Sequence, residues 1–350
     1  MQFGVKIPVT GPMATPERIV LAATEAEKLG YSTLNVNDHI HKPFERHGSY
    51  PVGQGSVSEP GNTADPNHFE TVTTFAYLAA LTKRIGLLWA VLPLPLRDPV
   101  ILAKELATLD ALSGGRCILG IGVSNVTDKA EYAALQKPFL PYEQRWEQAD
   151  EYVTAMKKIW TEPRASFHGK YVSFEDLTIY PKPHRPIPIW VGTRTLAGPR
   201  DRGPIRFSLK HADGWVYGHF APPSEIAAMR EAFQRSAQEV GKDISEFRLC
   251  VTKKISLAKT REEARRQIEW VLADTGMYRF AGYMWNLRES ALQETVQKAF
   301  VGTPADILKN IEDYVAAGVN GLDIWFVHPR FDGFMEQMKQ FADEVMPSFT

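Results

Sequence analysis

The sequence has few cysteines, no excess of charge of one sign and no long apolar run, and each shortage excludes a class of protein. Its 350 residues contain two cysteines, Cys117 and Cys250. Both fall in predicted buried strands, so we expect core packing rather than a disulfide or a metal site. Lysine and arginine number 40 against 41 acidic residues, a formal net charge of -1. This balance argues against nucleic acid or an anionic membrane as a partner.

The N-terminal residues MQFGVKIPVTGP lack the apolar core of a secretory signal. No apolar run approaches the roughly 20 residues that a membrane helix needs. We therefore predict a cytoplasmic protein whose partners are small molecules or other subunits.

The most informative stretch runs from Asp98 to Asn125, DPVILAKELATLDALSGGRCILGIGVSN. Apolar residues recur there at three- and four-residue intervals after Pro99, which predicts a helix that stops at the glycine pair 114–115. The apolar run 117–121 is typical of a parallel strand buried on both faces. Because ligands lie beyond the carboxyl ends of such strands, Gly122 and the polar residues after it are candidate cofactor contacts.

Strand-like runs and helical periodicities alternate along the whole chain. The predicted strands are residues 3–7, 33–37, 85–92, 117–121, 187–191, 215–217, 248–257 and 321–326. The predicted helices between and after them include residues 16–29, 68–81, 142–160, 224–240, 262–273, 304–317 and 331–345. Eight strands with intervening helices predict a single α/β domain over residues 1–350, a (β/α)8 TIM barrel, because an open sheet of this length usually shows fewer repeats or an extra domain.

Three segments exceed the minimal repeat: residues 41–67, 161–184 and 276–300. Long insertions in compact folds are often lids or binding loops, so we place them at the carboxyl-end face. The second and third are rich in aromatic residues. These side chains either form a substrate pocket or only cover barrel ends or a dimer contact.

Five motifs resemble one known family over nearly the whole chain. They are AEKLGYSTLNVNDH (26–39), LPLRDPVILAKELATLDALSGGRCILGIG (94–122), PIPIWVG (186–192), HADGW (211–215) and VGTPADILKNIEDYVAAGVNGL (301–322). The family is the luciferase-like monooxygenases, barrel enzymes that use reduced flavin or a deazaflavin coenzyme. The long loop after His39 and the sequence PLRDP look most like the deazaflavin-dependent branch, and flavin mononucleotide (FMN) stays open.

The resemblance implies a catalytic position for His39, which matches a histidine close to the reactive ring. Its imidazole would act as an acid or base near neutral pH, with Asp38 beside it at the cofactor. The alternative is a fixed Asp38–His39 hydrogen-bonded pair without proton transfer.

The family often has a non-proline cis peptide at the end of the third strand, behind the ring. Here it would fall at Trp89–Ala90 or at Ala90–Val91, so Trp89 and Ala90 are predicted cofactor contacts. Trp89 is large for this position. It would narrow the pocket or stack on substrate, or else pack in the core.

Other cofactor contacts follow from the resemblance by position. Gly122 and Asn125 would lie along the ring edge or the ribityl chain, and Gly192, Thr193 and Arg194 would hold a phosphate. Arg200 and Arg202 add positive charge that suits a phosphate or an anionic deazaflavin tail, although a solvated arginine loop explains it equally well.

The first functional prediction is therefore a reduced-FMN-dependent monooxygenase acting on a small organic substrate. The second is an oxidoreductase that uses an 8-hydroxy-5-deazaflavin coenzyme of the F-420 type for hydride transfer without oxygen. Relatives commonly form homodimers or higher homo-oligomers, and a separate reductase is a possible partner.

The sequence also allows two hypotheses from other functional classes. The H-x-H spacing of His39 and His41 is found in barrel metallohydrolases, but the further candidate ligands are badly placed along the strands. Those candidates are His184, His211, His219 and Asp323. A non-catalytic flavin-binding or structural role is the other alternative.

Overall fold

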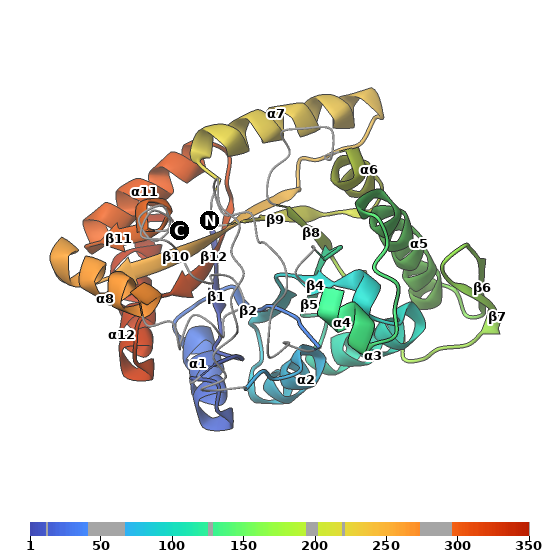
Figure 1. Cartoon of the computed structure of the whole chain (residues 1–350), viewed down its shortest axis with the longest axis horizontal. Coiled ribbons are helices and arrows are strands. Elements are labelled where there is room, and N and C mark those ends of the chain that lie inside the picture. The colour runs from blue at the N-terminus through green and yellow to red at the C-terminus, as the bar shows by residue number, and fades with distance from the viewer. Residues whose placement is uncertain are drawn as a thin grey trace.

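A closed parallel barrel surrounded by helices forms the body of the protein (Figure 1). The computed structural model describes residues 1–11, 13–40, 67–124, 129–193, 202–218, 221–273 and 296–349. Eight strands pair in parallel in the order β10-β12-β1-β2-β3-β5-β8-β9, and β9 pairs with β10 to close the ring. They are β1 (Gln2–Lys6), β2 (Thr33–Val36), β3 (Gly86–Trp89), β5 (Cys117–Gly122), β8 (Ile189–Thr193), β9 (Gly214–Tyr217), β10 (Arg248–Leu257) and β12 (Gly321–Phe326).

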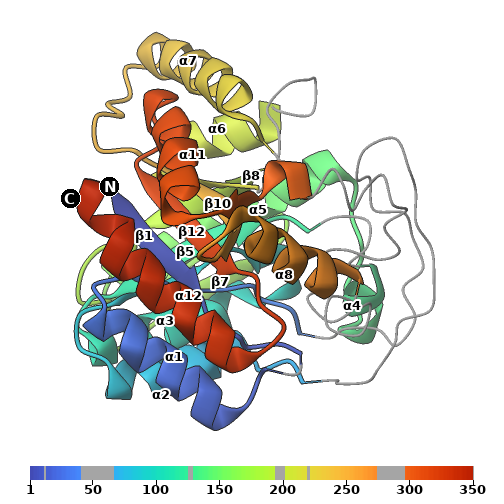
Figure 2. The same ribbon diagram turned by 90° about the vertical axis from the view of Figure 1, so that its left-hand side faces the viewer.

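Helices pack around the outside of this barrel. They are α1 (Pro16–Lys28), α2 (Thr71–Leu81), α3 (Pro99–Ser113), α4 (Lys129–Ala134), α5 (Tyr142–Thr161), α6 (Arg202–His211), α7 (Pro223–Glu239), α8 (Arg261–Ala273), α11 (Pro304–Ala316) and α12 (Phe331–Glu344), with short helices η1 (Leu94–Leu96) and η4 (Met346–Phe349). Figure 2 shows α12 beside α1 near both termini, where the amino group of Met1 donates to the carbonyl oxygen of Phe349 (2.8 Å). No described helix combines the length and the apolarity that a membrane crossing requires.

The sequence pattern predicted these elements closely. Strand β10 and strand β12 have the predicted bounds, and most other ends differ by one or two residues. Helix α2 begins at Thr71 rather than at residue 68, because the side chain of Glu70 caps it by accepting hydrogen bonds from the backbone of Val72 and Thr73. Short elements were missed: α4, α6, β4 (Leu92–Pro93) and β11 (Phe300–Gly302).

A capping side chain and two glycines determine where α3 begins and ends and how β5 packs against β3. The side chain of Asp98 accepts hydrogen bonds from the backbone of Val100 and Ile101 and caps the helix, and Gly114 ends it with a φ of 73°. Gly120 then brings β5 against β3, because a Cβ at that position would lie 2.0 Å from the carbonyl oxygen of Trp89. The two cysteines are free and buried, as predicted, and burial is the main cause that raises the pKa of Cys117 to about 12.

The placement of the second insertion at the carboxyl-end face is wrong. Residues 161–184 follow the end of α5 and precede β8, so they connect a helix to a strand at the amino-end face of the barrel. They contain the antiparallel hairpin β6 (Ala165–His168) and β7 (Ser173–Leu177), which lies at the outer edge in Figure 1. Glu151 on α5 accepts hydrogen bonds from the backbone of Tyr171 and Val172 in this hairpin. Its aromatic residues therefore do not line a pocket at the carboxyl ends.

The other two insertions are residues 41–67 and 276–300. Residues 41–66 and 274–295, which make up most of them, lie outside the described residues. The third insertion ends at Phe300, the first residue of β11, which pairs with Ile255–Leu257 at the carboxyl end of β10.

Candidate active site

The interior of the barrel has an apolar half and a polar half. Strands β3, β5, β8, β9 and the start of β10 contribute a buried cluster of apolar side chains: Leu88, Ala90, Trp190, Val216 and Cys250, with Val91 and Ile118 packed against it. Strands β1, β2, β12 and the rest of β10 contribute polar side chains: Lys6, Asn35, Thr252, Lys254 and Asp323, all buried. Such an interior suits a flat molecule with one apolar side and one polar side.

An apolar shelf lies at the carboxyl ends of the strands in the apolar half. The non-proline cis peptide joins Ala90 to Val91, which confirms the second of the two predicted positions. A Cβ on Gly122 would lie 2.9 Å from the Val91 side chain, and a Cβ on Gly192 would lie 2.6 Å from it. The two glycines therefore leave room for Val91 to settle against the barrel wall, where a larger residue would push it into the interior.

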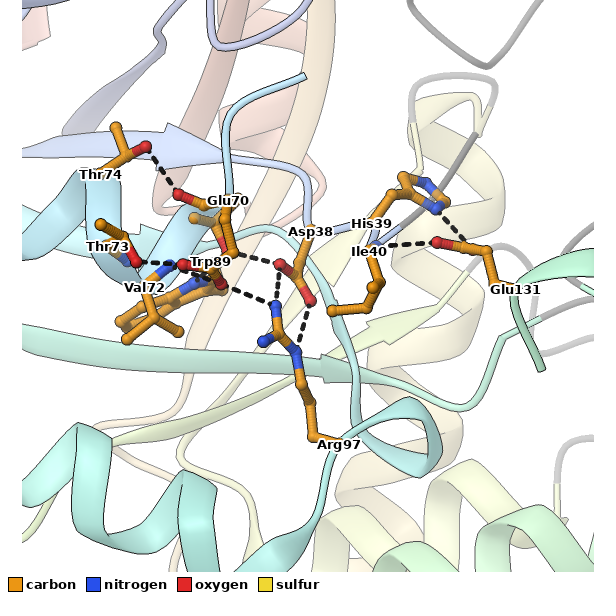
Figure 3. A network of polar contacts seen from close by, with 11 residues as sticks. Asp38, His39, Ile40, Glu70, Val72, Thr73, Thr74, Trp89, Arg97 and Glu131 are labelled. Carbon is orange, nitrogen blue, oxygen red and sulfur yellow. Dashed lines mark hydrogen bonds and ion pairs between the residues drawn. The ribbon is translucent and has the colours of Figure 1, made fainter. Parts of the chain in front are cut away.

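His39 lies just past the carboxyl end of β2 and forms a pair with Glu131 of α4 (Figure 3). Its Nδ1 is 2.9 Å from Oε2 of Glu131, and the backbone N–H of Ile40 donates to Oε1 at 2.9 Å. An ionised carboxylate only accepts hydrogen bonds, so the ring proton is assigned to Nδ1, which leaves Nε2 as an acceptor. The Glu131 side chain is 2% exposed and that of His39 is 11% exposed.

Asp38 points away from His39 and anchors the same segment to the barrel wall (Figure 3). Its carboxylate accepts two hydrogen bonds from Arg97, at 3.1 and 2.6 Å, and one from Thr71 at 2.5 Å. Its backbone N–H donates to the carbonyl oxygen of Val91 (3.2 Å). This last bond ties the segment that carries His39 directly to the shelf.

The side chains of Asp38 and Trp89, two predicted cofactor contacts, are held by other residues of the protein. The side chains of Asp38 and Trp89 are buried, and the indole of Trp89 packs edge-on against Phe75 and donates to the Thr71 hydroxyl (3.0 Å). Trp89 therefore packs in the core and does not stack on a substrate, because its side chain faces α2 rather than the barrel interior. The Asp38 carboxylate binds Arg97 rather than the His39 imidazole, and in this way it holds the segment that carries His39.

The structure describes some of the remaining predicted cofactor contacts. Gly122 and Gly192 lie on the shelf, and Thr193 ends β8, although its side chain is not described. Asn125, Arg194 and Arg200 lie outside the described residues, and Arg202 begins α6. HADGW joins α6 to β9, and the Asp213 carboxylate accepts a hydrogen bond from the backbone N–H of Ile189.

Sequence reasoning missed Glu131 and the role of Arg97. Glu131 belongs to a six-residue helix with no distinctive pattern, and its partner is 92 positions away. Arg97 stood within the quoted motif PLRDP, but a motif does not reveal which side chain its guanidinium will contact. The one signal in the sequence is Asp38 beside His39, because a carboxylate that becomes buried is normally paired with a positive group.

A metal site receives no support from the proposed ligands. Asp323 is inside the barrel, whereas His184 lies in the loop before β8, where its backbone N–H donates to the Asp110 carboxylate of α3. His211 ends α6 and pairs with Asp150 of α5. His41 and His219 fall outside the described residues, and within the described part of the chain no three candidate ligands gather.

Comparison with known proteins decides the family. A family model described as luciferase-like monooxygenase matches residues 1–321. The chain belongs to the luciferase-like monooxygenases. As a family member it is a flavin- or deazaflavin-dependent oxidoreductase, which overturns the hydrolase and the non-catalytic alternatives.

Luciferase-like relatives with both kinds of cofactor span almost the whole chain. An FMNH2-dependent dimethylsulfone monooxygenase from Pseudomonas putida is 28% identical over 350 residues, 93% of this chain and 91% of the relative. An F420-dependent glucose-6-phosphate dehydrogenase from Intrasporangium calvum is 26% identical over 347 residues, 95% of this chain and 94% of the relative.

Solved luciferase-like structures have the same fold. An F420-dependent secondary alcohol dehydrogenase in complex with an F420–acetone adduct superimposes with a TM-score of 0.75 at 18% identity, over 99% of this chain and 98% of that one. The oxygenating constituent of 3,6-diketocamphane monooxygenase from Pseudomonas putida, in complex with FMN, gives 0.73 at 18% identity, over 100% and 99%. At this identity the likeness shows the fold alone.

His211 provides a test of pH-dependent stability in this luciferase-like barrel. Burial lowers its pKa to about 4, although Asp150 favours the charged form. The unfolded chain binds a proton near pH 6.5, so stability is lost as the pH falls from about 6.5 to about 4. Between pH 7 and pH 4 we expect the wild type to lose about 2 kcal/mol more than His211→Asn, a value reduced for partial solvent screening. Urea unfolding at both pH values measures this, and equal losses would contradict it.

Proposed function

We propose that the protein is a reduced-FMN-dependent monooxygenase that acts on a small organic substrate at the carboxyl-end mouth of the barrel. The observation that carries the proposal is the shelf of Ala90 and Val91 facing an interior whose mouth also holds the His39–Glu131 pair. The FMNH2-dependent relative favours flavin. Deazaflavin-dependent hydride transfer is the second candidate, favoured by the F420-dependent relative and by the quoted motifs.

The residues present fit a flat ring. A Cβ at Gly122 or Gly192 would push the Val91 side chain toward the space that such a ring needs, and the chain has glycine at both positions. Ala90 and Val91 would support the ring from behind, and Thr193 would contact the phosphate. When bound, reduced FMN supplies two electrons and activates oxygen, whereas a reduced deazaflavin supplies a hydride.

The chain's own residues contribute proton handling and the exclusion of water. His39 Nε2 accepts or returns a proton at the substrate, while Glu131 keeps the other ring nitrogen occupied. The apolar cluster behind the shelf keeps water from that side of the interior. Arg97 and Asp38 hold the backbone on which both features depend.

The test is an anaerobic titration of the purified protein with reduced FMN and, in parallel, with a reduced deazaflavin coenzyme, followed by absorbance and fluorescence. Micromolar binding of FMN in preference to the deazaflavin supports the monooxygenase, and the reverse preference supports hydride transfer. Binding of neither cofactor would contradict both candidates.

Two glycine variants sharpen this titration. Gly192→Ala should weaken binding of the preferred cofactor about tenfold or more, because its new methyl group displaces Val91. Gly321→Ala is the matched control, since the nearest atoms to its Cβ are at ordinary contact distances of 3.4–3.5 Å. Equal affinity in both variants would show that the shelf does not bind the cofactor.

A separate reductase and a homodimer also belong to this proposal. The reductase would supply reduced FMN in a two-component system. A dimer would cover apolar side chains that are exposed on neighbouring helices, Tyr77 and Leu81 of α2 and Ile101 and Leu112 of α3. Sedimentation equilibrium gives the mass, and a monomer at all concentrations would rule the dimer out.

A further inference from the structure

Two lysines occupy the polar half of the barrel interior. Lys6 ends β1 and Lys254 lies on β10, and both side chains are within reach of Trp325 on β12, the strand between them. The Nζ atoms of Lys6 and Lys254 are 5.4 and 5.3 Å from the centroid of the Trp325 ring. Lys6 and Lys254 are 9% and 1% exposed. Charged side chains at this depth are uncommon, and the fold places two of them beside one indole.

Burial and the charge of Lys6 both disfavour the charged form of Lys254 and lower its pKa to about 7. Asp323 lies 3.5 Å from Lys6, but its carboxylate also accepts hydrogen bonds from Asn35 (2.6 Å) and Thr252 (2.8 Å). A negative group bound beside both lysines would relieve their repulsion, which a neutral molecule would not do.

This lysine pair lies at the active site rather than deep below it. Lys254 pairs in register with Trp325 near the carboxyl end of β12, and Lys6 pairs with Asn35 near that of β2. Lys6 Nζ donates to the side-chain oxygen of Asn37 (2.6 Å), two residues before His39. Asn37 and Trp325 are half-buried. A group held here therefore has the remainder of its molecule next to the catalytic imidazole.

We propose that Lys6 and Lys254, with Trp325 and Asn37, form a subsite for the anionic group of the substrate, which is a small organic acid bearing a carboxylate or a sulfonate. The inference rests on the proposed function, because it assigns the substrate of that same site. Both ammonium groups lie within 5.4 Å of the centroid of the Trp325 ring, so a compact anion at the edge of the indole would be attracted by both charges. The reacting carbon would then lie between this subsite and the shelf.

The first experiment needs no cofactor and no turnover. Acetate and methanesulfonate are the probes, added to the full-length protein while thermal unfolding is followed. At about ten times its dissociation constant a probe should raise the melting temperature by about 2–3 °C. Lys254→Met and Lys6→Met should each weaken probe binding about 10–100-fold and abolish this shift.

Lys253→Met is the matched control. Lys253 is the next residue on the same strand, equally buried at 1% exposed, but its ammonium lies over Tyr314 and Phe300 outside the barrel. Burial is also the main cause that lowers its pKa to about 7. This variant should keep the full response to both probes. The proposal is overturned if the wild type does not respond or if all three variants respond alike.

Cofactor titration separates this proposal from the proposed function. Retained cofactor binding with no anion response would leave the oxidoreductase site and remove the anion subsite. An anion response without any cofactor binding would leave the anion subsite and contradict the proposed oxidoreductase function. Competition between methanesulfonate and FMN for one site would show that the lysines contact the cofactor, and would overturn their assignment to the substrate.

Discussion

Replacing Arg97 by methionine is expected to lower the free energy of unfolding by about 3–5 kcal/mol. The change leaves the Asp38 carboxylate, whose side chain is 0% exposed, without its two hydrogen bonds from the guanidinium. Arg97 itself is held in the charged form: burial would lower its pKa, but the charges of Asp38 and Glu70 outweigh burial and raise it. Urea unfolding at pH 7 measures the loss.

Two comparisons establish that the loss comes from the buried carboxylate. Arg265→Met removes an exposed arginine paired with Glu269 on α8 and should change stability by about 0.5 kcal/mol or less. The double variant Asp38→Asn/Arg97→Met removes both charges and should be more stable than Arg97→Met alone. A loss below about 1 kcal/mol in Arg97→Met would mean that the ion pair does not hold the segment around His39.

The same ion pair shows where prediction from the sequence stops. Strand and helix periodicity, with glycine and proline at the ends, was enough to predict the barrel, because the period of the apolar residues indicates each element's type and the alternation of strands and helices indicates the fold. It was also enough to place His39, Gly122 and Gly192 at the carboxyl ends of strands. Neither the contact between Arg97 and Asp38, 59 positions apart, nor that between His39 and Glu131 leaves a periodic signal.

The misplaced second insertion has a different cause. The order of elements implies that a segment after a helix lies at the amino-end face, whereas the length and aromatic content of this segment favoured a loop at the carboxyl-end face. In the structure Tyr171 and Phe174 pack on the outer core instead. Composition is therefore a weaker guide to location than connectivity in a barrel of this kind.

Replacing His39 by glutamine is expected to lower kcat about 10²–10⁴-fold, the usual contribution of general acid–base catalysis. Cofactor affinity should stay within a few-fold of the wild type, because the shelf of Ala90 and Val91 follows β3, whereas His39 follows β2. The measurement is steady-state turnover of the cofactor-loaded enzyme with a substrate that it accepts. An unchanged kcat would mean that the imidazole moves no proton in the limiting step.

Glu131 is expected to act through His39 as a positioning residue. In Glu131→Gln the amide can donate to Nδ1 of His39, which shifts the ring proton to Nε2 and leaves no acceptor facing the substrate. We expect kcat to fall about 10–100-fold with little change in KM, and Glu143→Gln, an exposed change on α5, to have no effect. Added imidazole should restore part of the activity of His39→Ala but none of that of Glu131→Gln, in which the ring is still present. If the double variant His39→Gln/Glu131→Gln loses more than His39→Gln alone, Glu131 has a role independent of the imidazole.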